Sequence, residues 1–329
     1  MRLLFVGDVM LGRLVNDVLK ERPPEFPWGD TLPLFQRADV RVSNLECALA
    51  DHGAPWSRTP KIFHFRSDAK NVQSLQAAQI DAVSLANNHT LDFEEEALCE
   101  TLTVLDNAGI HHAGAGQTLS EATRPALWAV QNLKFGLLSF TDNEPEWEAT
   151  ETWAGICYVP TDLDDARTQG LLATVTRVKA QVDVLIIAAH WGPNWGYRPP
   201  RDHPPLAHAL IDAGADILFG HSGHVVRGVE WYHNRPIMYC LGDFVDDYAV
   251  DEIERNDRSG IFLLEIEDKR ITRLLLYPTI IQHFQAKLAS GSEREAIVAK
   301  MQQFCQELHT DTTWNEQEGA LELLNTAAL

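Results

Sequence analysis

The sequence lacks the cysteine pattern of a disulfide framework or of a thiolate zinc site. Its 329 residues include five cysteines, which are scattered and form no C-x-x-C pair. Small secreted domains and zinc ribbons depend on such spacings. Neither class is therefore indicated, and a reducing compartment is expected.

Long hydrophobic runs and an excess of basic residues are also missing. No segment approaches the roughly 18 apolar residues of a membrane-spanning helix, and the apolar stretch at the N-terminus is too short for a signal peptide. The formal net charge is −20, whereas nucleic acids and anionic membranes bind to basic surfaces. We therefore expect a cytoplasmic protein with neither partner. An anionic substrate would need local compensation from bound metal and arginines.

The chain does contain short apolar runs of strand length that end in polar residues able to bind metal. These runs span residues 3–6, 38–42, 82–86, 182–189 and 216–219. Helical patterns lie at residues 69–78, 94–107, 163–179 and 204–213. Alternating strands and helices predict a parallel sheet, in which the carboxyl ends of the strands share one edge. The polar clusters should therefore converge in space.

The pattern changes after about residue 225. Paired apolar segments at 226–232 and 236–241, and at 260–266 and 271–277, predict hairpins and an antiparallel sheet. An earlier hairpin within residues 126–140 could join this second sheet. From about residue 292 we expect a helix followed by a loosely ordered end.

The polar clusters together supply two carboxylates, one amide oxygen and three imidazoles. These candidate metal ligands are Asp8, Glu46, Asn88, His190, His221 and His224. A mixture of oxygen and nitrogen ligands suits Mn²⁺, Fe²⁺ or Zn²⁺. Two ions would need a bridging carboxylate. One ion and two ions both remain open at this point.

His89 directly follows Asn88, so the two side chains should diverge and His89 should face the substrate. There it could act as a general acid, with Asp92 fixing its tautomer. The alternative is a loop histidine that is hydrogen-bonded to the backbone.

Several residues beside the ligand motifs are weaker candidates for substrate contact. They are Arg13, Asn44, Asn87, Trp191 and Arg227. The arginines could hold a carboxylate or phosphate, and Trp191 with Trp195 could form one wall of a cleft. Asp243 either orients a histidine or belongs to a solvated acidic loop.

Six motifs occur in order along the chain. They are Gly7-Asp8-Val9-Met10-Leu11-Gly12-Arg13, Asn44-Leu45-Glu46, Ala86-Asn87-Asn88-His89, His190-Trp191-Gly192, Gly220-His221-Ser222-Gly223-His224 and Leu241-Gly242-Asp243-Phe244. Together they resemble the CapA-type poly-γ-glutamate synthesis family of the calcineurin-like metallophosphatase superfamily. The resemblance implies a four-layer α/β/β/α sandwich of two mixed sheets, with a metal centre at one edge. It also implies metal-ligand positions for the six candidate ligands and the acid role for His89.

The same resemblance predicts the domain organisation, and two features of the metal site stay open. We expect a single domain over residues 1–329, recognisable to about residue 285 and followed by a helix and tail over 286–329. The superfamily's first motif has a histidine where Met10 stands, so a one-ion site is an alternative. Ser222 and Gly223 separate His221 from His224, so either histidine could be the ligand.

The leading functional hypothesis is a divalent-metal-dependent hydrolase of the phosphoesterase type, with metal-bound hydroxide as the nucleophile. One alternative is a non-catalytic metal-binding accessory protein of poly-γ-glutamate or capsule metabolism. Another is a γ-glutamyl hydrolase. The substrate would be a small or polymeric anion, and the sequence does not predict an oligomeric state.

Overall fold

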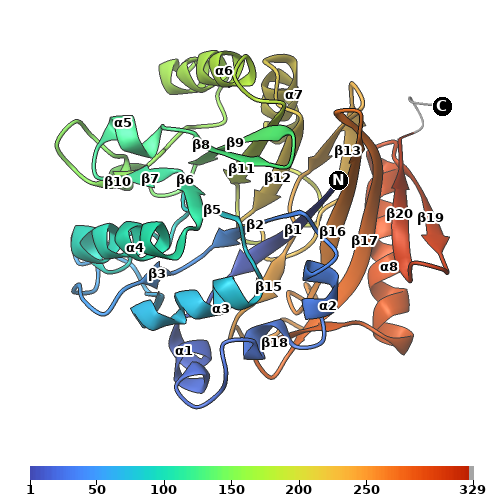
Figure 1. The fold of residues 1–329 in the computed structure, drawn as a ribbon, viewed down its shortest axis with the longest axis horizontal. Helices are drawn as coiled ribbons and strands as arrows, with labels where there is room; N and C mark the ends of the chain where they lie inside the picture. Colours follow the sequence, from blue (N-terminus) through green and yellow to red (C-terminus); the bar gives the residue numbers. More distant parts are fainter. Residues whose placement is uncertain (326–329) are drawn as a thin grey trace.

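Two mixed β-sheets face each other and carry helices on their outer sides (Figure 1). The structure is a computed structural model that describes residues 1–325. None of the helices in these residues combines the length and apolar character that crossing a membrane requires.

The larger sheet has ten strands in the order β19-β20-β17-β16-β1-β2-β5-β6, with β15 beside β1 and β18 beside β17. Their bounds are β1 (Arg2–Val9), β2 (Val40–Leu45), β5 (Ala82–Ser84), β6 (His111–Ala113), β15 (Asp243–Val245), β16 (Arg258–Glu267), β17 (Arg270–Gln282), β18 (Gln285–Leu288), β19 (Asp311–Asn315) and β20 (Ala320–Leu324). Strands β1, β2, β5 and β6 are parallel, whereas β16 and β17 are antiparallel.

The smaller sheet has six strands in the order β13-β14-β12-β11-β9-β8. Their bounds are β8 (Ala126–Val130), β9 (Leu133–Thr141), β11 (Val184–His190), β12 (Ile217–His221), β13 (Val229–Tyr232) and β14 (Arg235–Met238). Two short pairs stand apart: β3 (Ala48–Leu49) with β4 (Arg66–Ser67), and β7 (Ala115–Gly116) with β10 (Gly155–Ile156).

The helices complete the outer layers. They are α1 (Arg13–Leu19), α2 (Leu32–Phe35), α3 (Val72–Ala77), α4 (Glu94–Ala108), α5 (Leu119–Ala122), α6 (Ala166–Lys179), α7 (His203–Asp212) and α8 (Gly291–Glu307), with 3₁₀ turns η1 (Phe26–Trp28), η2 (Ala69–Asn71) and η3 (Pro145–Trp147). In Figure 1, α3 and α4 lie beside the larger sheet, and α6 and α7 lie beside the smaller one.

Three large buried clusters alternate with the two sheets and give the four layers. Along β1, Leu3 and Phe5 pack between the sheets, where the Phe5 ring lies 5.2 Å from that of Phe219. Leu4 and Val6 point to the opposite side, into the cluster that includes residues of α3 and α4. Side chains alternate along a strand, so a continuous apolar run is the expected sequence of a strand buried on both faces. The α/β/β/α sandwich of two mixed sheets is confirmed.

The distribution of strands differs from the sequence prediction. All five apolar runs form strands, but β1, β2 and β5 belong to the larger sheet while β11 and β12 belong to the smaller one. The early hairpin β8–β9 pairs with β11, and the late hairpin β16–β17 pairs with β1. The expected division into one parallel and one antiparallel sheet is therefore wrong, because strands far apart in sequence pair with each other.

The C-terminal segment after α8 is also more ordered than predicted. Strands β19 and β20 form a hairpin, and β20 pairs with β17 at the edge of the larger sheet. Leu321 and Leu323 are buried in the cluster between the sheets. The prediction of a loosely ordered end is wrong for residues 311–324, and its last four positions, 326–329, lie outside the described residues.

Two glycines provide a matched test of this packing. A Cβ on Gly7 would lie 1.8 Å from the carbonyl oxygen of Gly242, the oxygen that accepts the backbone N–H of Asp8. We expect Gly7→Ala to lower the free energy of unfolding by about 1–3 kcal/mol. Gly170 lies in α6, and a Cβ there meets nothing within 4 Å. Gly170→Ala should raise stability by about 0.5–1 kcal/mol. Urea denaturation measures both, and equal effects would contradict the tight contact at Gly7.

Candidate metal centre

The carboxyl ends of the central strands of both sheets meet at one place. Asp8 of β1 lies in register with Asn44 of β2 on one side and with Asp243 of β15 on the other. In the smaller sheet, His190 of β11 lies in register with His221 of β12. Ligands of open α/β sheets bind at such carboxyl ends. The pairing registers therefore bring carboxylates and imidazoles together.

These side chains form two groups of potential ligand atoms. Asp8, His190 and His221 make one group, and Asp8, Glu46, His224 and Asp243 make the other. Within each group the ligand atoms lie within 4.8 Å of one another. Asp8 belongs to both groups, which is the position that a carboxylate between two ions requires. His221 and His224 lie in different groups, so the two histidines are not alternatives for one position.

The donor atoms of these residues fit a metal ion. Several buried side-chain atoms have no hydrogen-bond partner within residues 1–325; they are Glu46 Oε1, Asn88 Oδ1, His190 Nε2, His221 Nε2 and Asp243 Oδ2. Buried polar atoms normally have partners. A cluster of unpartnered oxygen and nitrogen atoms therefore suits a divalent metal ion.

The pKa shifts of the clustered side chains also favour a bound cation. Burial raises the pKa of Asp8 to about 6. Burial, followed by the charges of neighbouring carboxylates, raises the pKa values of Glu46 and Asp243 well above their usual range. Burial also lowers the pKa of His221 to about 3. Carboxylates buried together repel one another, so a bound cation would stabilise their charged forms.

His89 and Asp92 lie beside this cluster. His89 Nδ1 is 2.6 Å from Asp92 Oδ2, and the same carboxylate oxygen accepts the backbone N–H of Phe65 at 2.6 Å. The Phe65 ring stacks on the imidazole with 3.8 Å between centroids. Burial lowers the pKa of His89. Asp92 therefore fixes the orientation of the ring and holds the proton on Nδ1.

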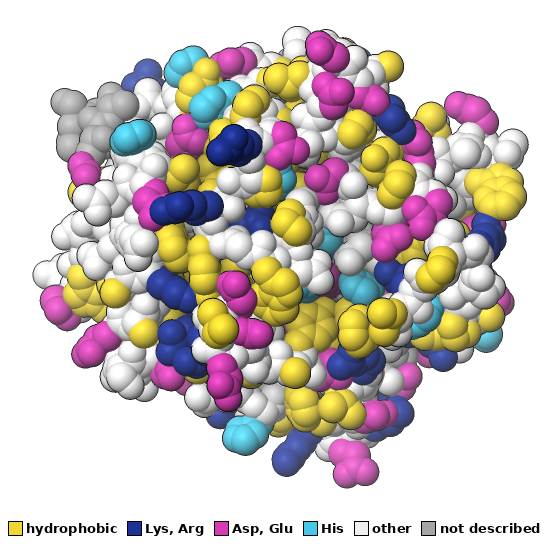
Figure 2. All heavy atoms as spheres, turned by 180° about the vertical axis from the view of Figure 1, so that it is seen from behind, with side chains coloured by type: hydrophobic (Ala, Val, Ile, Leu, Met, Phe, Trp, Pro, Cys, Tyr) yellow, Lys and Arg dark blue, Asp and Glu magenta, His cyan; other side chains and the backbone are white. Residues whose placement is uncertain are grey.

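A cleft of about 530 Å³ opens above the cluster. Asn88, His89 and His224 line its inner part, and Arg13 and Trp195 also contribute to its lining. The Arg13 guanidinium forms a two-point ion pair with Asp247, with N···O distances of 3.1 and 2.9 Å. In Figure 2, hydrophobic side chains gather near the centre of the face around a hollow in which histidine side chains are visible.

Comparison with known proteins gives the family. Residues 2–248 match the family described as bacterial capsule synthesis protein PGA_cap. The chain belongs to this family. It is 31% identical over 335 positions to a probable polyglutamine synthesis accessory protein of Mycobacterium tuberculosis, covering 89% of this chain and 88% of that protein. It is 24% identical to the capsule biosynthesis protein CapA of Bacillus anthracis, covering 97% of this chain and 76% of that protein.

Solved structures of similar fold include a phosphatase. A structure described as a novel phosphatase from Mycoplasma pneumoniae matches with a TM-score of 0.51 at 12% identity, covering 85% of this chain and 93% of that one. A hypothetical protein from Thermus thermophilus matches with a TM-score of 0.50 at 16% identity, covering 84% of this chain and 98% of that one. At such low identity these matches show a similar fold and nothing more.

In this PGA_cap chain Met10 stands in the first motif, and Asp243 is a further candidate ligand from another part of the fold. Met10 is buried, and its sulfur accepts the backbone N–H of Gly12 at 3.0 Å. Asp243, which the sequence suggested only as a group that orients a histidine, contacts His224 Nδ1 at 2.8 Å through one oxygen. Its other oxygen is unpartnered among the described residues, and Asp243 belongs to the second ligand group. The Leu241-Gly242-Asp243-Phe244 motif was the signal available in the sequence.

Trp191 and Arg227 do not reach the cleft. Trp191 is fully buried, donates from Nε1 to the carbonyl of Tyr239 at 3.0 Å and stacks on His203. Arg227 is also fully buried, and it donates to the carbonyl of Gly196 at 2.9 Å. The predicted substrate contacts are wrong for both residues. Trp191 points to the side opposite to His190 at the strand end, and Arg227 is engaged by backbone carbonyls. The tryptophan that lines the cleft is Trp195.

Asn44 and Asn87 form hydrogen bonds that hold Asp8 and His89 in position. The Asn44 side chain donates to Asp8 at 2.7 Å and accepts from Asn87 at 3.0 Å. Asn87 also accepts the backbone N–H of His89 at 3.0 Å. Both amides are thus used within the protein and buried. We assign them a positioning role for Asp8 and His89 in place of the predicted substrate contact.

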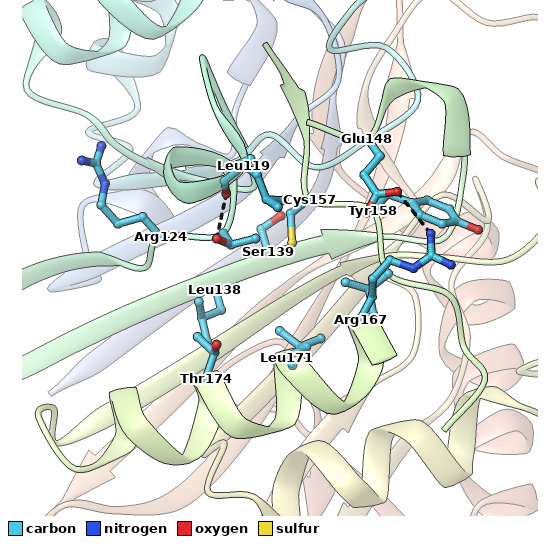
Figure 3. A pocket seen from close by; sticks show the side chains of 14 residues that line it. Leu119, Arg124, Leu138, Ser139, Glu148, Cys157, Tyr158, Arg167, Leu171 and Thr174 are labelled. Carbon is cyan, nitrogen blue, oxygen red and sulfur yellow. Dashed lines mark hydrogen bonds and ion pairs between the residues drawn. The ribbon is translucent and has the colours of Figure 1, made fainter. Parts of the chain in front are cut away.

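A smaller pocket of about 280 Å³ lies between α5, α6 and β9 (Figure 3). None of the candidate metal ligands lines it. Arg167 is paired with Glu148 at 3.2 Å, and in Figure 3 the Arg124 side chain extends away from the other labelled residues. The cleft above Asp8 is therefore the better candidate for chemistry.

Proposed function

We propose that this PGA_cap protein is a divalent-metal-dependent hydrolase of the phosphoesterase type. The observation that carries the proposal is the pair of ligand groups that share Asp8 at the base of a cleft lined by His89. One ion would be held by Asp8, His190 and His221 with Asn88 nearby. The other would be held by Asp8, Glu46, His224 and Asp243.

The residues of the chain have separate tasks in this proposal. Divalent ions in these positions would supply Lewis acidity that polarises a phosphoryl oxygen and activates water. His89 would donate a proton to the departing oxygen, while Asp92 keeps the ring oriented. Asn44 and Asn87 hold Asp8 and the backbone of His89 in place. Because the ligand side chains are buried, bulk water has little access to them.

A second candidate is the accessory role named in relatives. The Mycobacterium tuberculosis relative is described as a synthesis accessory protein, and the Bacillus anthracis relative as a capsule biosynthesis protein. In that role the metal centre would hold a polymer end or stabilise a binding surface without turnover. A γ-glutamyl hydrolase is the least supported hypothesis, since a chain of net charge −20 disfavours long polyanions.

Metal content and turnover separate these functions. Protein purified without chelator and supplied with Mn²⁺ is expected to retain about two ions per chain by elemental mass spectrometry. It should hydrolyse p-nitrophenyl phosphate, and a control dialysed against chelator should not. Retained metal without turnover of any phosphoester would favour the accessory role. Release of glutamate from poly-γ-glutamate, with phosphoesters untouched, would favour the γ-glutamyl hydrolase.

A further inference from the structure

The cleft offers little spare positive charge. Among the residues that line it, the cationic side chains are Arg13 and Lys61. Arg13 is engaged by Asp247. Lys61 donates to the carbonyl of Asn88 at 2.6 Å and lies 3.4 Å from Asp92 and from Glu144. Bound metal would thus compensate one phosphate-sized anion, whereas further anionic groups would meet acidic side chains.

The mouth of the cleft is instead apolar. Ile62, Phe63 and Trp195 line it, and their exposed fractions are 85%, 58% and 43%. We call these three residues the apolar collar. Val250 and Ile253, also exposed, lie in the segment that contributes Ala249 and Asn256 to the lining. Exposed hydrophobic side chains that cluster together often mark a ligand-binding or interaction site.

Aromatic rings connect the collar to the inner part of the cleft. The rings of Phe63 and Phe65 lie 6.4 Å apart, and Phe65 stacks on His89. The Tyr248 ring lies 5.5 Å from that of Phe65 and 5.3 Å from that of His224, to which it is nearly perpendicular. An apolar surface thus runs from the collar to the residue that would protonate the leaving group.

From this arrangement, and resting on the proposed function, we infer the class of substrate. We propose that the substrate is a phosphomonoester whose alcohol portion is an apolar aryl or alkyl group, which packs against Phe63 and Trp195. The oxygen of water forms the new bond to phosphorus and the bond from phosphorus to the alcohol oxygen breaks. The proton from His89 goes to that oxygen, and the proton lost by water reprotonates His89 by way of the solvent, so that the acid is restored. The products are inorganic phosphate and an apolar alcohol.

Binding of phosphonates, which are not hydrolysed, tests this inference. Isothermal titration calorimetry of the Mn²⁺-loaded full chain would compare phenylphosphonate, methylphosphonate and phosphonoacetate. We expect phenylphosphonate to bind at least about fivefold more tightly than methylphosphonate, as one well-packed aromatic contact provides. Phe63→Ala and Trp195→Ala should each reduce this ratio. Trp153→Ala is the matched control, because Trp153 is 54% exposed and does not line the cleft.

The outcomes distinguish this inference from the proposed function. Equal binding of phenylphosphonate and methylphosphonate, or tightest binding of phosphonoacetate, would overturn the substrate class even if Mn²⁺ is retained and p-nitrophenyl phosphate is turned over. A phenyl preference that survives both collar substitutions would also overturn it. Failure to retain Mn²⁺, measured beforehand on the same sample, together with no phosphonate binding would overturn both proposals.

Discussion

Replacing Asp8 with asparagine is expected to remove both metal ions and to leave the metal-free protein at least as stable as the wild type. Asp8 belongs to both ligand groups. Loss of a direct ligand should therefore weaken metal binding by more than the roughly 100-fold seen when an outer partner is lost. The metal-free protein should gain stability, because Asp8→Asn removes one of several carboxylates that are buried together.

Elemental mass spectrometry and thermal unfolding with and without Mn²⁺ measure this prediction. Wild-type protein should show a rise in Tm on adding Mn²⁺, since the ion binds the folded state, and Asp8→Asn should not. His190→Ala removes a ligand of one group and should leave about one ion. Asp17→Asn is a control at an exposed carboxylate. An Asp8→Asn protein with wild-type metal content would contradict the shared position of Asp8.

His89→Ala is expected to lower kcat by about 10²–10⁴ without changing the metal content. The loss should be larger for phenyl phosphate than for p-nitrophenyl phosphate, because nitrophenolate is the better leaving group and needs less help from an acid. Steady-state kinetics with both esters under one metal condition measures this difference.

Two further variants define the role of the histidine. Asp92→Asn should also lower kcat, since an amide cannot hold the proton on His89 Nδ1 as the carboxylate does at 2.6 Å. His52→Ala is the control. The His52 side chain is exposed and forms an ion pair with Glu100, away from the candidate metal ligands. If His89→Ala hydrolysed both esters at the wild-type rate, His89 would not be the acid.

Short-range sequence patterns predicted much of the candidate site. Each predicted ligand motif directly follows or ends an apolar strand, and five of the six predicted ligands, Asp8, Glu46, His190, His221 and His224, lie in the two groups that could hold an ion. The spacing of His89 and Asp92 likewise predicted their contact, because residues three apart on one turn can meet. The same patterns did not separate residues that face the cleft from those that turn away.

The sequence by itself determined where strands end in side chains that are able to bind metal and that the chain belongs to the α/β class. Only the tertiary structure decided which sheet each strand joins, that Asp243 comes beside Asp8 through the β1–β15 pair, and that Trp191 and Arg227 are buried. The physical reason is the range of the interactions. Burial on both faces of a strand leaves its mark on consecutive residues. Pairing between strands distant in the chain and the side to which a loop residue turns depend on packing partners that no short segment specifies.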